Sequence, residues 1–202
     1  MVIKKGDDWG SATSWDLVEA EPATDREMAI QAAHAHEHGH RAVFSVPDGA
    51  SDVAKTLGLS RAQRRSEPLC YPFDLGFVQL DDGAQHPFVV GCVARRRFWH
   101  GPFLVAMNVG WLGPRYLGPR AHPNDGLLDI TTGRLGWRQR LQADRRSRTG
   151  THLPHPELKI VRQAEAMYQL DRRVRVVVDG EPVGMSAQFC FRVVPDALLV
   201  IG

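Results

Sequence analysis

The chain has 202 residues, 43% of them hydrophobic, and its 25 basic and 23 acidic side chains give a formal charge of +2. Such a chain can bury a core as one domain or two small ones, which excludes general disorder, and its near-neutral charge argues against a nucleic-acid partner. No apolar run approaches the ~20 residues of a membrane span, and the N-terminus lacks the layout of a signal peptide. The 3 cysteines are widely spaced among apolar residues, which is typical of reduced core side chains, so we expect a cytoplasmic protein.

The first part of the chain predicts a small α/β unit. Thr24 opens a capping box, and the alanine-rich run after it, ended by Gly39, predicts a helix. The apolar run 42–46 predicts a buried strand, and segment 47–52 leads into a second short helix ended by Gly58. Backbone N–H groups at such a junction attract phosphate, although an ordinary strand-to-helix connection explains the same pattern.

Histidines gather at the end of the first predicted helix, at His34, His36, His38 and His40. His34 and His38 are spaced to face the same side of a helix, which would be a start for a metal site, but no third ligand has a suitable spacing nearby. The helix dipole also favours histidines at a C-terminus. A metal sensor here is the weakest of the functions we consider.

The second part of the chain predicts antiparallel strands separated by Gly, Pro and Asp. We expect them at 71–80, 88–93, 103–108, 173–178, 189–194 and 197–201. The predicted fold class is therefore α+β, with a small α/β N-terminal lobe over residues 1–66 followed by a predominantly antiparallel β-sandwich over residues 67–202.

One amphipathic helix, about 137–146, is expected to interrupt the strands. Its pattern places Trp137 and Leu141 inward and its arginines outward. Six arginines crowd the segment from Arg134 to Arg148, which favours either a solvated helix face or a surface for phosphate or anionic lipid. Aromatic side chains between Phe98 and Trp111 would suit an acyl groove, but at this density they are more often core.

Two acidic turns are the strongest candidates for a functional site. In PRAHPNDGLLDI, residues 119–130, Asp125 lies in a turn made by proline and glycine, where a carboxylate and main-chain oxygens could converge on a hard cation. Near the C-terminus, Asp179 and Gly180 predict a tight hairpin that leaves Glu181 at the start of the returning strand. The two turns could share one pocket. Taken alone, such an Asp more often caps its own turn and such a Glu more often faces solvent.

Four motifs in order resemble the diacylglycerol kinase-like superfamily, in particular the bacterial lipid kinases related to sphingosine and NAD kinases. They are MNVGWLGPRYLGPRAHPNDGLLDI (107–130), GTHLPHP (150–156), VDGEPV (178–183) and PDALLV (195–200). The resemblance covers roughly residues 41–202. It implies a nucleotide-binding α/β lobe joined to an antiparallel β-sandwich, with the active site in the cleft between them.

The resemblance also implies an activity, which is ATP- and Mg²⁺-dependent phosphoryl transfer to a lipid hydroxyl. Asp125 stands at the family's metal-binding aspartate, whose companions are backbone carbonyls, here those of His122 and Leu127. Glu181 stands at the general base, in the same catalytic turn as Asp179. A carboxylate within reach of a hydroxyl is what such chemistry needs.

The phosphate-binding loops depart from the family pattern. The glycine-rich GGDGT-type loop has no match, because the run 6–10 places an Asp and a Trp where small residues are needed. The second loop is reduced to a segment whose nucleotide-binding candidates are Gly49, Ser51 and Asp52. The alternative is therefore a catalytically inactive relative that serves as a ligand-binding or assembly module. Expected partners are a lipid or other small hydroxyl substrate, a peripheral membrane contact and a second copy of the chain in a homodimer.

Overall fold

The computed structural model describes residues 9–46, 51–59, 67–99, 101–151 and 156–202. The strands of its main sheet are β1 (Ser11–Ala12), β2 (Val43–Ser45), β3 (Leu69–Leu80), β4 (Gln85–Phe88), β5 (Gly91–Arg95), β6 (Pro102–Met107), β9 (Leu128–Arg134), β10 (Leu158–Gln163), β11 (Glu165–Val178) and β12 (Glu181–Ile201). A separate small hairpin is made by β7 (Trp111–Leu112) and β8 (Arg115–Tyr116). The helices are α1 (Asp25–Glu37), α2 (Asp52–Thr56) and α3 (Trp137–Ser147).

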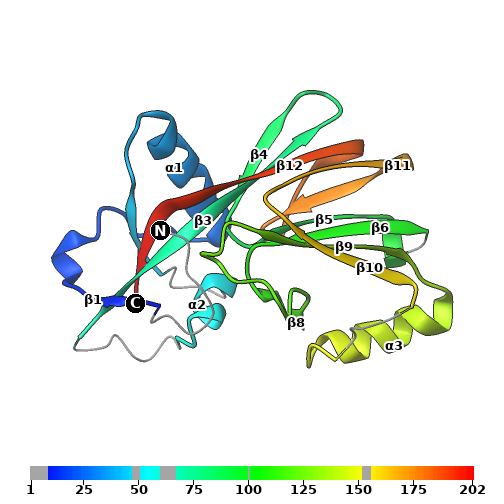
Figure 1. The fold of residues 1–202 in the computed structure, drawn as a ribbon, viewed down its shortest axis with the longest axis horizontal. Helices are drawn as coiled ribbons and strands as arrows, with labels where there is room; N and C mark the ends of the chain where they lie inside the picture. The colour runs from blue at the N-terminus through cyan, green and yellow to red at the C-terminus, as the bar shows by residue number, and fades with distance from the viewer. Residues whose placement is uncertain (1–8, 47–50, 60–66, 100, 152–155) are drawn as a thin grey trace.

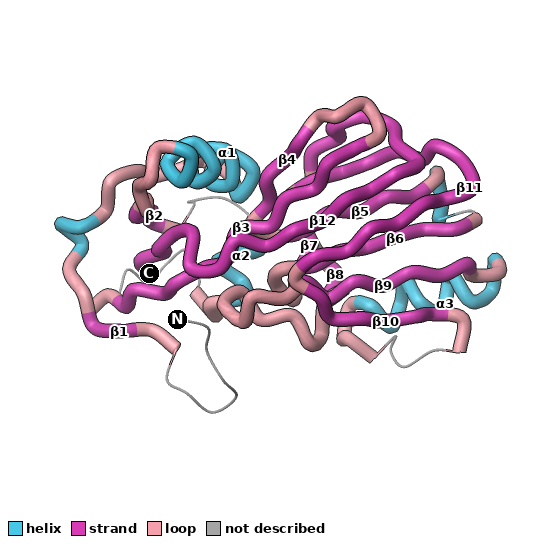
Figure 2. The backbone as a smooth tube through the Cα atoms, turned by 45° about the horizontal axis from the view of Figure 1, so that its top comes forward, coloured by secondary structure: helices cyan, strands magenta, loops and turns pink. Residues whose placement is uncertain are grey.

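The ten strands of the main sheet are joined by hydrogen bonds, and eight of them follow one continuous path (Figures 1 and 2). The order is β1-β3-β12-β11-β5-β6-β9-β10, with β4 beside β3 and β2 beside β12. In the described part of the chain, these strands pair antiparallel except where β2 runs parallel to the end of β12. Together with the few helices, this confirms the expected α+β class with mostly antiparallel strands.

Alternate residues of the central strands face two different cores, as the two-residue period of a strand requires. In β6, Phe103 and Val105 belong to the first core, whereas Leu104 belongs to the second. The second core brings together side chains of strands that lie far apart in the sheet order, such as Val78 of β3 and Leu128 of β9. The sheet therefore folds over on itself into two packed layers.

The first core is completed by α1, which lies against β3, β4 and β12 (Figure 1). Its buried face contributes Met28, Ala29 and Ala32. The helix begins as predicted, because the Thr24 hydroxyl accepts the backbone N–H of Glu27 at 3.1 Å. Because β2 pairs with β12, the N-terminal segment extends the same sheet rather than forming one of its own.

Strand β12 is longer than expected, because a proline and an aspartate inside it read as a break in the sequence. The segments 189–194 and 197–201 are parts of β12, which is 21 residues long. Its register against β3 shifts between Val194 and Leu198, and Asp196 adopts a φ of 54° there. A β-bulge accommodates a proline that a regular strand would exclude.

The expected orientation of α3 is wrong. Trp137 is 62% exposed and Leu141 is 59% exposed, so both face outward. The inner face instead carries Arg140, Ala143 and Ser147, which line a small apolar pocket above β6. These residues follow helical spacing on one side of the helix. The physical reason is that small side chains let the short helix pack closely, so its large apolar residues are left on the other side.

The cysteine expectation holds only in part. The 3 cysteines are free thiols, but Cys92 alone is fully buried, and Cys190 is exposed. Among the described residues, no helix is long and apolar enough to cross a membrane.

Candidate functional site

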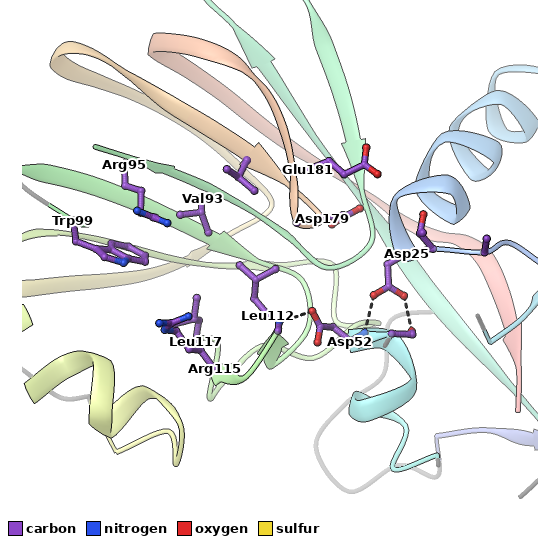
Figure 3. Close-up of a pocket in the computed structure, with 16 residues that line it drawn as sticks. Asp25, Asp52, Val93, Arg95, Trp99, Leu112, Arg115, Leu117, Asp179 and Glu181 are labelled. Atoms are coloured by element: carbon purple, nitrogen blue, oxygen red, sulfur yellow. Dashed lines mark hydrogen bonds between the residues drawn. The ribbon is translucent and has the colours of Figure 1, made fainter. Parts of the chain in front are cut away.

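A cavity of about 480 Å³ opens between the N-terminal helices, β5, the β7–β8 hairpin and the β11–β12 turn (Figure 3). Carboxylates line one end of it and guanidinium groups the other. The acidic end consists of Asp25, Asp52, Asp179 and Glu181, and the basic end of Arg95 and Arg115. Val93, Val177, Leu112 and Leu117 also line the cavity and supply its apolar surface.

The β11–β12 turn is the tight hairpin that the sequence predicts. Asp179 and Gly180 have φ values of 47° and 85°, and positive φ at both central residues is typical of a type I′ turn. The Asp179 carboxylate accepts backbone N–H groups from Val89 (3.1 Å), Val90 (3.0 Å) and Gly91 (2.9 Å). This carboxylate therefore fastens the hairpin to the start of β5.

The two acidic side chains of this turn differ in their surroundings. Burial raises the pKa of Asp179 to about 7, although the three N–H donors favour its charged form. Glu181 is exposed and lines the cavity, and its carboxylate makes no hydrogen bond or ion pair to another described residue. Of the two predicted catalytic residues, Glu181 is the one whose carboxylate oxygens are available to a ligand.

Two of the predicted nucleotide-binding residues also line the cavity, but other protein groups engage them. Ser51 donates its hydroxyl proton to Asp25 at 2.5 Å, and the Asp52 backbone N–H donates to the same carboxylate at 2.7 Å. The Asp52 side chain accepts from the Gly113 N–H at 2.6 Å and from Lys55 at 2.8 Å. Burial raises the pKa of Asp25. The third candidate, Gly49, lies outside the described residues.

The predicted metal-binding turn lies elsewhere. His122, Asp125 and Leu127 do not line this cavity, so the expectation that the two acidic turns share one pocket is wrong. The His122 ring packs against Trp9 with ring centres 4.9 Å apart. Instead of facing the cavity, the Asp125 turn rests on β3, where the Gly126 N–H donates to the buried carboxylate of Asp74 at 2.6 Å.

Asp125 has both carboxylate oxygens engaged in this arrangement. One accepts the N–H of Leu127 at 3.0 Å, and the other is bound by Arg162, whose Nε also donates to Asp129 at 2.9 Å. Burial raises the pKa of Asp125, while the Arg162 guanidinium opposes the rise. A divalent cation would have to displace Arg162 to reach Asp125. The metal site thus stays a prediction.

The histidine cluster stays a weak candidate. The rings of His34 and His38 lie 4.4 Å apart, and His40 contacts Glu19 at 2.7 Å. Within the described residues, no group of three His, Cys, Asp or Glu side chains is placed to hold a metal ion.

Three functional features escaped sequence reasoning. Asp25 reaches Ser51 from 26 positions away, and Arg162 reaches Asp125 from 37 positions away, so no local spacing marks either contact. The basic end of the cavity was missed as well. Its one available signal was the run Arg95-Arg96-Arg97, of which only Arg95 lines the cavity.

Comparisons with known proteins agree with this architecture. The model of the family described as "YegS C-terminal NAD kinase beta sandwich-like domain" matches residues 61–202. A search of curated proteins finds no match.

Solved structures from Bacillus anthracis str. Sterne share the fold. A "putative diacylglycerol kinase" superposes with a TM-score of 0.64 at 13% identity, covering 88% of this chain and 74% of that one. A second structure, described as a diacylglycerol kinase, gives 0.60 at 13% identity, with coverages of 80% and 67%. Identity this low shows the fold alone, whereas the family match spans most of the chain. The chain therefore belongs to the family of proteins with the YegS C-terminal NAD kinase beta sandwich-like domain.

Proposed function

We propose that the chain is a lipid kinase-like phosphotransferase that moves the γ-phosphoryl group of ATP to an alcohol, with the cavity of Figure 3 as its active site. The observation that carries the proposal is the unengaged carboxylate of Glu181, which lines the same cavity as Ser51 and Asp52. A hydroxyl nucleophile needs a carboxylate within hydrogen-bond reach, and the remaining catalysis is positioning and charge neutralisation.

In this proposal, Glu181 is the general base. The acceptor oxygen bonds to the γ-phosphorus as the bond from that phosphorus to the β,γ-bridging oxygen breaks. The acceptor's hydroxyl proton passes to the Glu181 carboxylate, and ADP leaves. The Mg²⁺ that accompanies ATP would neutralise the phosphate charge. Asp179 acts as a positioning residue, because its three N–H contacts fix the turn that carries Glu181.

The test is transfer of labelled phosphate from MgATP to a lipid extract. The wild-type chain should label an alcohol, and Glu181→Gln should lose the transfer while retaining MgATP affinity. Unchanged transfer in Glu181→Gln would remove the residue from its role. The control is Glu165→Gln, an exposed glutamate at the start of β11 that does not line the cavity.

A catalytically inactive, ligand-binding relative is the second candidate. This candidate is favoured by the hydrogen bonds that Ser51 and Asp52 already make with Asp25 and Gly113. A nucleotide can bind Ser51 and Asp52 only when these hydrogen bonds break or are shared with it. Calorimetric titration with MgATP separates the two candidates. Heat release and a Mg²⁺-dependent rise in Tm support the kinase, whereas their absence at millimolar nucleotide supports the inactive relative.

The orientation of α3 supports a peripheral contact with an anionic membrane. Its outer face combines Trp137 and Leu141 with the guanidinium groups of Arg138 and Arg145, a combination typical of interfacial helices. Phe98, 72% exposed, lies beside α3, where its carbonyl accepts from Arg140 at 2.9 Å. Trp137→Ser with Leu141→Ser should lower sedimentation with phosphatidylglycerol vesicles. Equal sedimentation of the double variant and wild type would exclude this face.

A homodimer stays a proposal as well. Strand β10 is hydrogen-bonded to β9 and is the last strand in the sheet order. The backbone groups of its other edge would be the ones to pair with a strand of a second copy. Sedimentation equilibrium of the wild type against Val161→Pro, a substitution in β10, tests whether this edge pairs two copies. An unchanged mass for a dimeric wild type would place the interface elsewhere.

A further inference from the structure

The β7–β8 hairpin is a wall of the cavity that is not part of the main sheet. Its two strands pair with each other, with Leu112 opposite Arg115, and among the described strands they pair with none of the ten in the main sheet. A two-stranded hairpin is only marginally stable by itself in water, so contacts outside it must hold it in place. Leu112, Gly113 and Arg115 line the cavity. A displacement of the hairpin would therefore open the cavity on this side.

The tip of the hairpin is clasped by helix α2. The Gly113 N–H donates to one Asp52 carboxylate oxygen at 2.6 Å (Figure 3), and Lys55 Nζ donates to the Gly113 carbonyl at 2.9 Å. Lys55 also donates to the other Asp52 oxygen at 2.8 Å, so the two side chains form one polar clasp. While the tip is in this position, protein groups occupy both oxygens of the Asp52 carboxylate.

A second contact holds the returning strand to helix α3. Arg115 of β8 donates from Nε to an Asp144 carboxylate oxygen at 2.9 Å. The two side chains are 34% and 39% exposed, and an ion pair so open to solvent contributes little to stability. The side chain of Lys55 at the tip is also 40% exposed. Polar contacts that reach solvent in this way can open in local fluctuations that leave the core folded.

The base of the hairpin is fixed by close packing. The Gly118 N–H donates to the Gly110 carbonyl at 3.1 Å. Gly118 is buried so closely that an added Cβ would lie 2.8 Å from the Cβ of Met107. The rings of Trp111 and Tyr116, with centres 4.9 Å apart, join the two strands to each other. The hairpin would therefore move as one unit about this base.

The hairpin also separates the cavity from the small apolar pocket beneath α3. Arg115 and Leu117 line both spaces, and so does Trp99. The pocket has a volume of about 60 Å³, and Phe103 and Leu135 are part of its apolar lining. Moving β8 away from α3 would join the two spaces, so that a ligand could extend from the cavity to the space under the helix.

We propose that the β7–β8 hairpin is a lid, held closed in this structure by Asp52 and Lys55 at its tip and by Asp144 at its returning strand. Opening about the base frees the Asp52 carboxylate and joins the cavity to the apolar pocket. The lid itself follows from the contacts of the hairpin. That a nucleotide uses the freed Asp52 rests on the proposed kinase function, so it has a separate test.

The first test is amide hydrogen exchange of the ligand-free protein, followed by mass spectrometry. Asp144→Asn removes the contact to α3, and Lys55→Gln removes the contact to the tip. In each variant, exchange in residues 111–117 should rise about two- to fivefold, as the loss of one partly exposed ion pair implies, while α1 and β3 exchange as in the wild type. The two substitutions change the net charge in opposite directions, so a shared effect cannot come from charge.

The matched control is Asp171→Asn, which breaks an exposed ion pair with Arg134 and should leave exchange in the hairpin unchanged. Unchanged exchange in both test variants would overturn the lid. A rise in only one of them would also overturn it, because the hairpin would not move as one unit. An equal rise in α1 and β3 would show general destabilisation and would contradict the lid as well.

The second test is calorimetric titration of the same variants with MgATP. If the nucleotide binds only while the lid is open, its apparent affinity is proportional to the open fraction. The affinity of Asp144→Asn and of Lys55→Gln for MgATP should therefore rise by the same factor as exchange in the hairpin. Equal affinity in variants and wild type would overturn the link between lid and nucleotide. If exchange rises but none of the three proteins binds MgATP, the kinase proposal fails and the lid remains.

Discussion

The turn that carries Glu181 and the turn that carries Asp125 are held in similar ways, but they differ in whether that carboxylate is available to a ligand. In each, a buried carboxylate accepts three N–H groups and fixes a turn against a neighbouring strand: Asp179 holds the residues before β5, and Asp74 holds the Asp125 turn. Beside Asp179, Glu181 is left unengaged at a cavity. In the turn held by Asp74, the Asp125 carboxylate is bound by Arg162. A turn motif in the sequence thus predicts where a carboxylate lies, whereas residues remote in sequence determine whether that carboxylate is available to a ligand.

The largest difference between the two turns should appear when the carboxylate of Glu181 or of Asp125 is replaced by its amide. Glu181→Gln should lower phosphoryl transfer by 10²- to 10⁴-fold, the range typical of a lost general base, with little change in stability. Asp125→Asn should change transfer far less, since Asp125 is outside the cavity. The rate of phosphoryl transfer from MgATP to a lipid extract measures both. A larger loss in Asp125→Asn than in Glu181→Gln would reverse the assignment of the two turns.

Removing the anchor of the Glu181 turn should be costly for stability. Asp179→Ala leaves three backbone N–H groups without an acceptor, and the expected loss in the free energy of unfolding is about 3 kcal/mol or more. Urea denaturation measures it. Asp179→Asn keeps one acceptor oxygen and should lose less. If both variants are as stable as the wild type, Asp179 does not hold the turn.

The two anchors should also shape how stability depends on pH. Burial raises the pKa of both Asp74 and Asp179 to about 7, well above the value of an unfolded aspartate. A raised carboxyl pKa contributes stability that is present at acid pH and lost as pH rises through 7, at up to about 1.4 kcal/mol per pH unit for each group. The free energy of unfolding should therefore fall between pH 5 and pH 7.

The variant that checks this pH effect is Asp74→Asn, measured by urea denaturation across the same range. Its absolute stability will be lower, because it loses part of the acceptor set, but its fall with pH should be shallower than in the wild type. Parallel pH profiles for the two proteins would show that Asp74 does not change its protonation on unfolding.

The smallest expected effect comes from removing the ion pair between Arg162 and Asp125. Arg162→Gln leaves Asp125 and Asp129 facing each other without their shared cation, and the loss should be about 1 kcal/mol, because Arg162 is partly exposed and solvent screens it. In the absence of nucleotide, the variant should also gain a Mg²⁺-dependent rise in Tm that the wild type lacks. A Mg²⁺ response already present in the wild type would mean that a cation displaces Arg162.

Local patterns in the sequence were enough for much of the fold. The capping box at Thr24 and the Asp-Gly hairpin at Asp179 both appear where predicted, since each depends on residues a few positions apart. The orientation of α3 was missed because its inner face packs through Ala143 and Ser147, which carry no hydrophobic signal. The length of β12 was missed because its bulge has the composition of a turn.

The candidate site was predicted less completely, for a physical reason. Glu181, Ser51 and Asp52 were all named, and all three line the cavity. Whether they are available to a ligand depends on Asp25 and on Gly113, which are remote in sequence. The cavity's basic end was missed for the same reason, because it forms only when Arg95 of β5 and Arg115 of the β7–β8 hairpin come to line one cavity.

Strand β12 also has a consequence for how the protein is made. It pairs with β3 and β11 along most of its length and with β2 at its end, so it joins early and late parts of the chain. A ribosome releases this strand after every other strand of the sheet. Until then, β2 and β3 lack their main partner and expose apolar edges, a state prone to aggregation. Chaperone demand during synthesis should therefore be high for this chain.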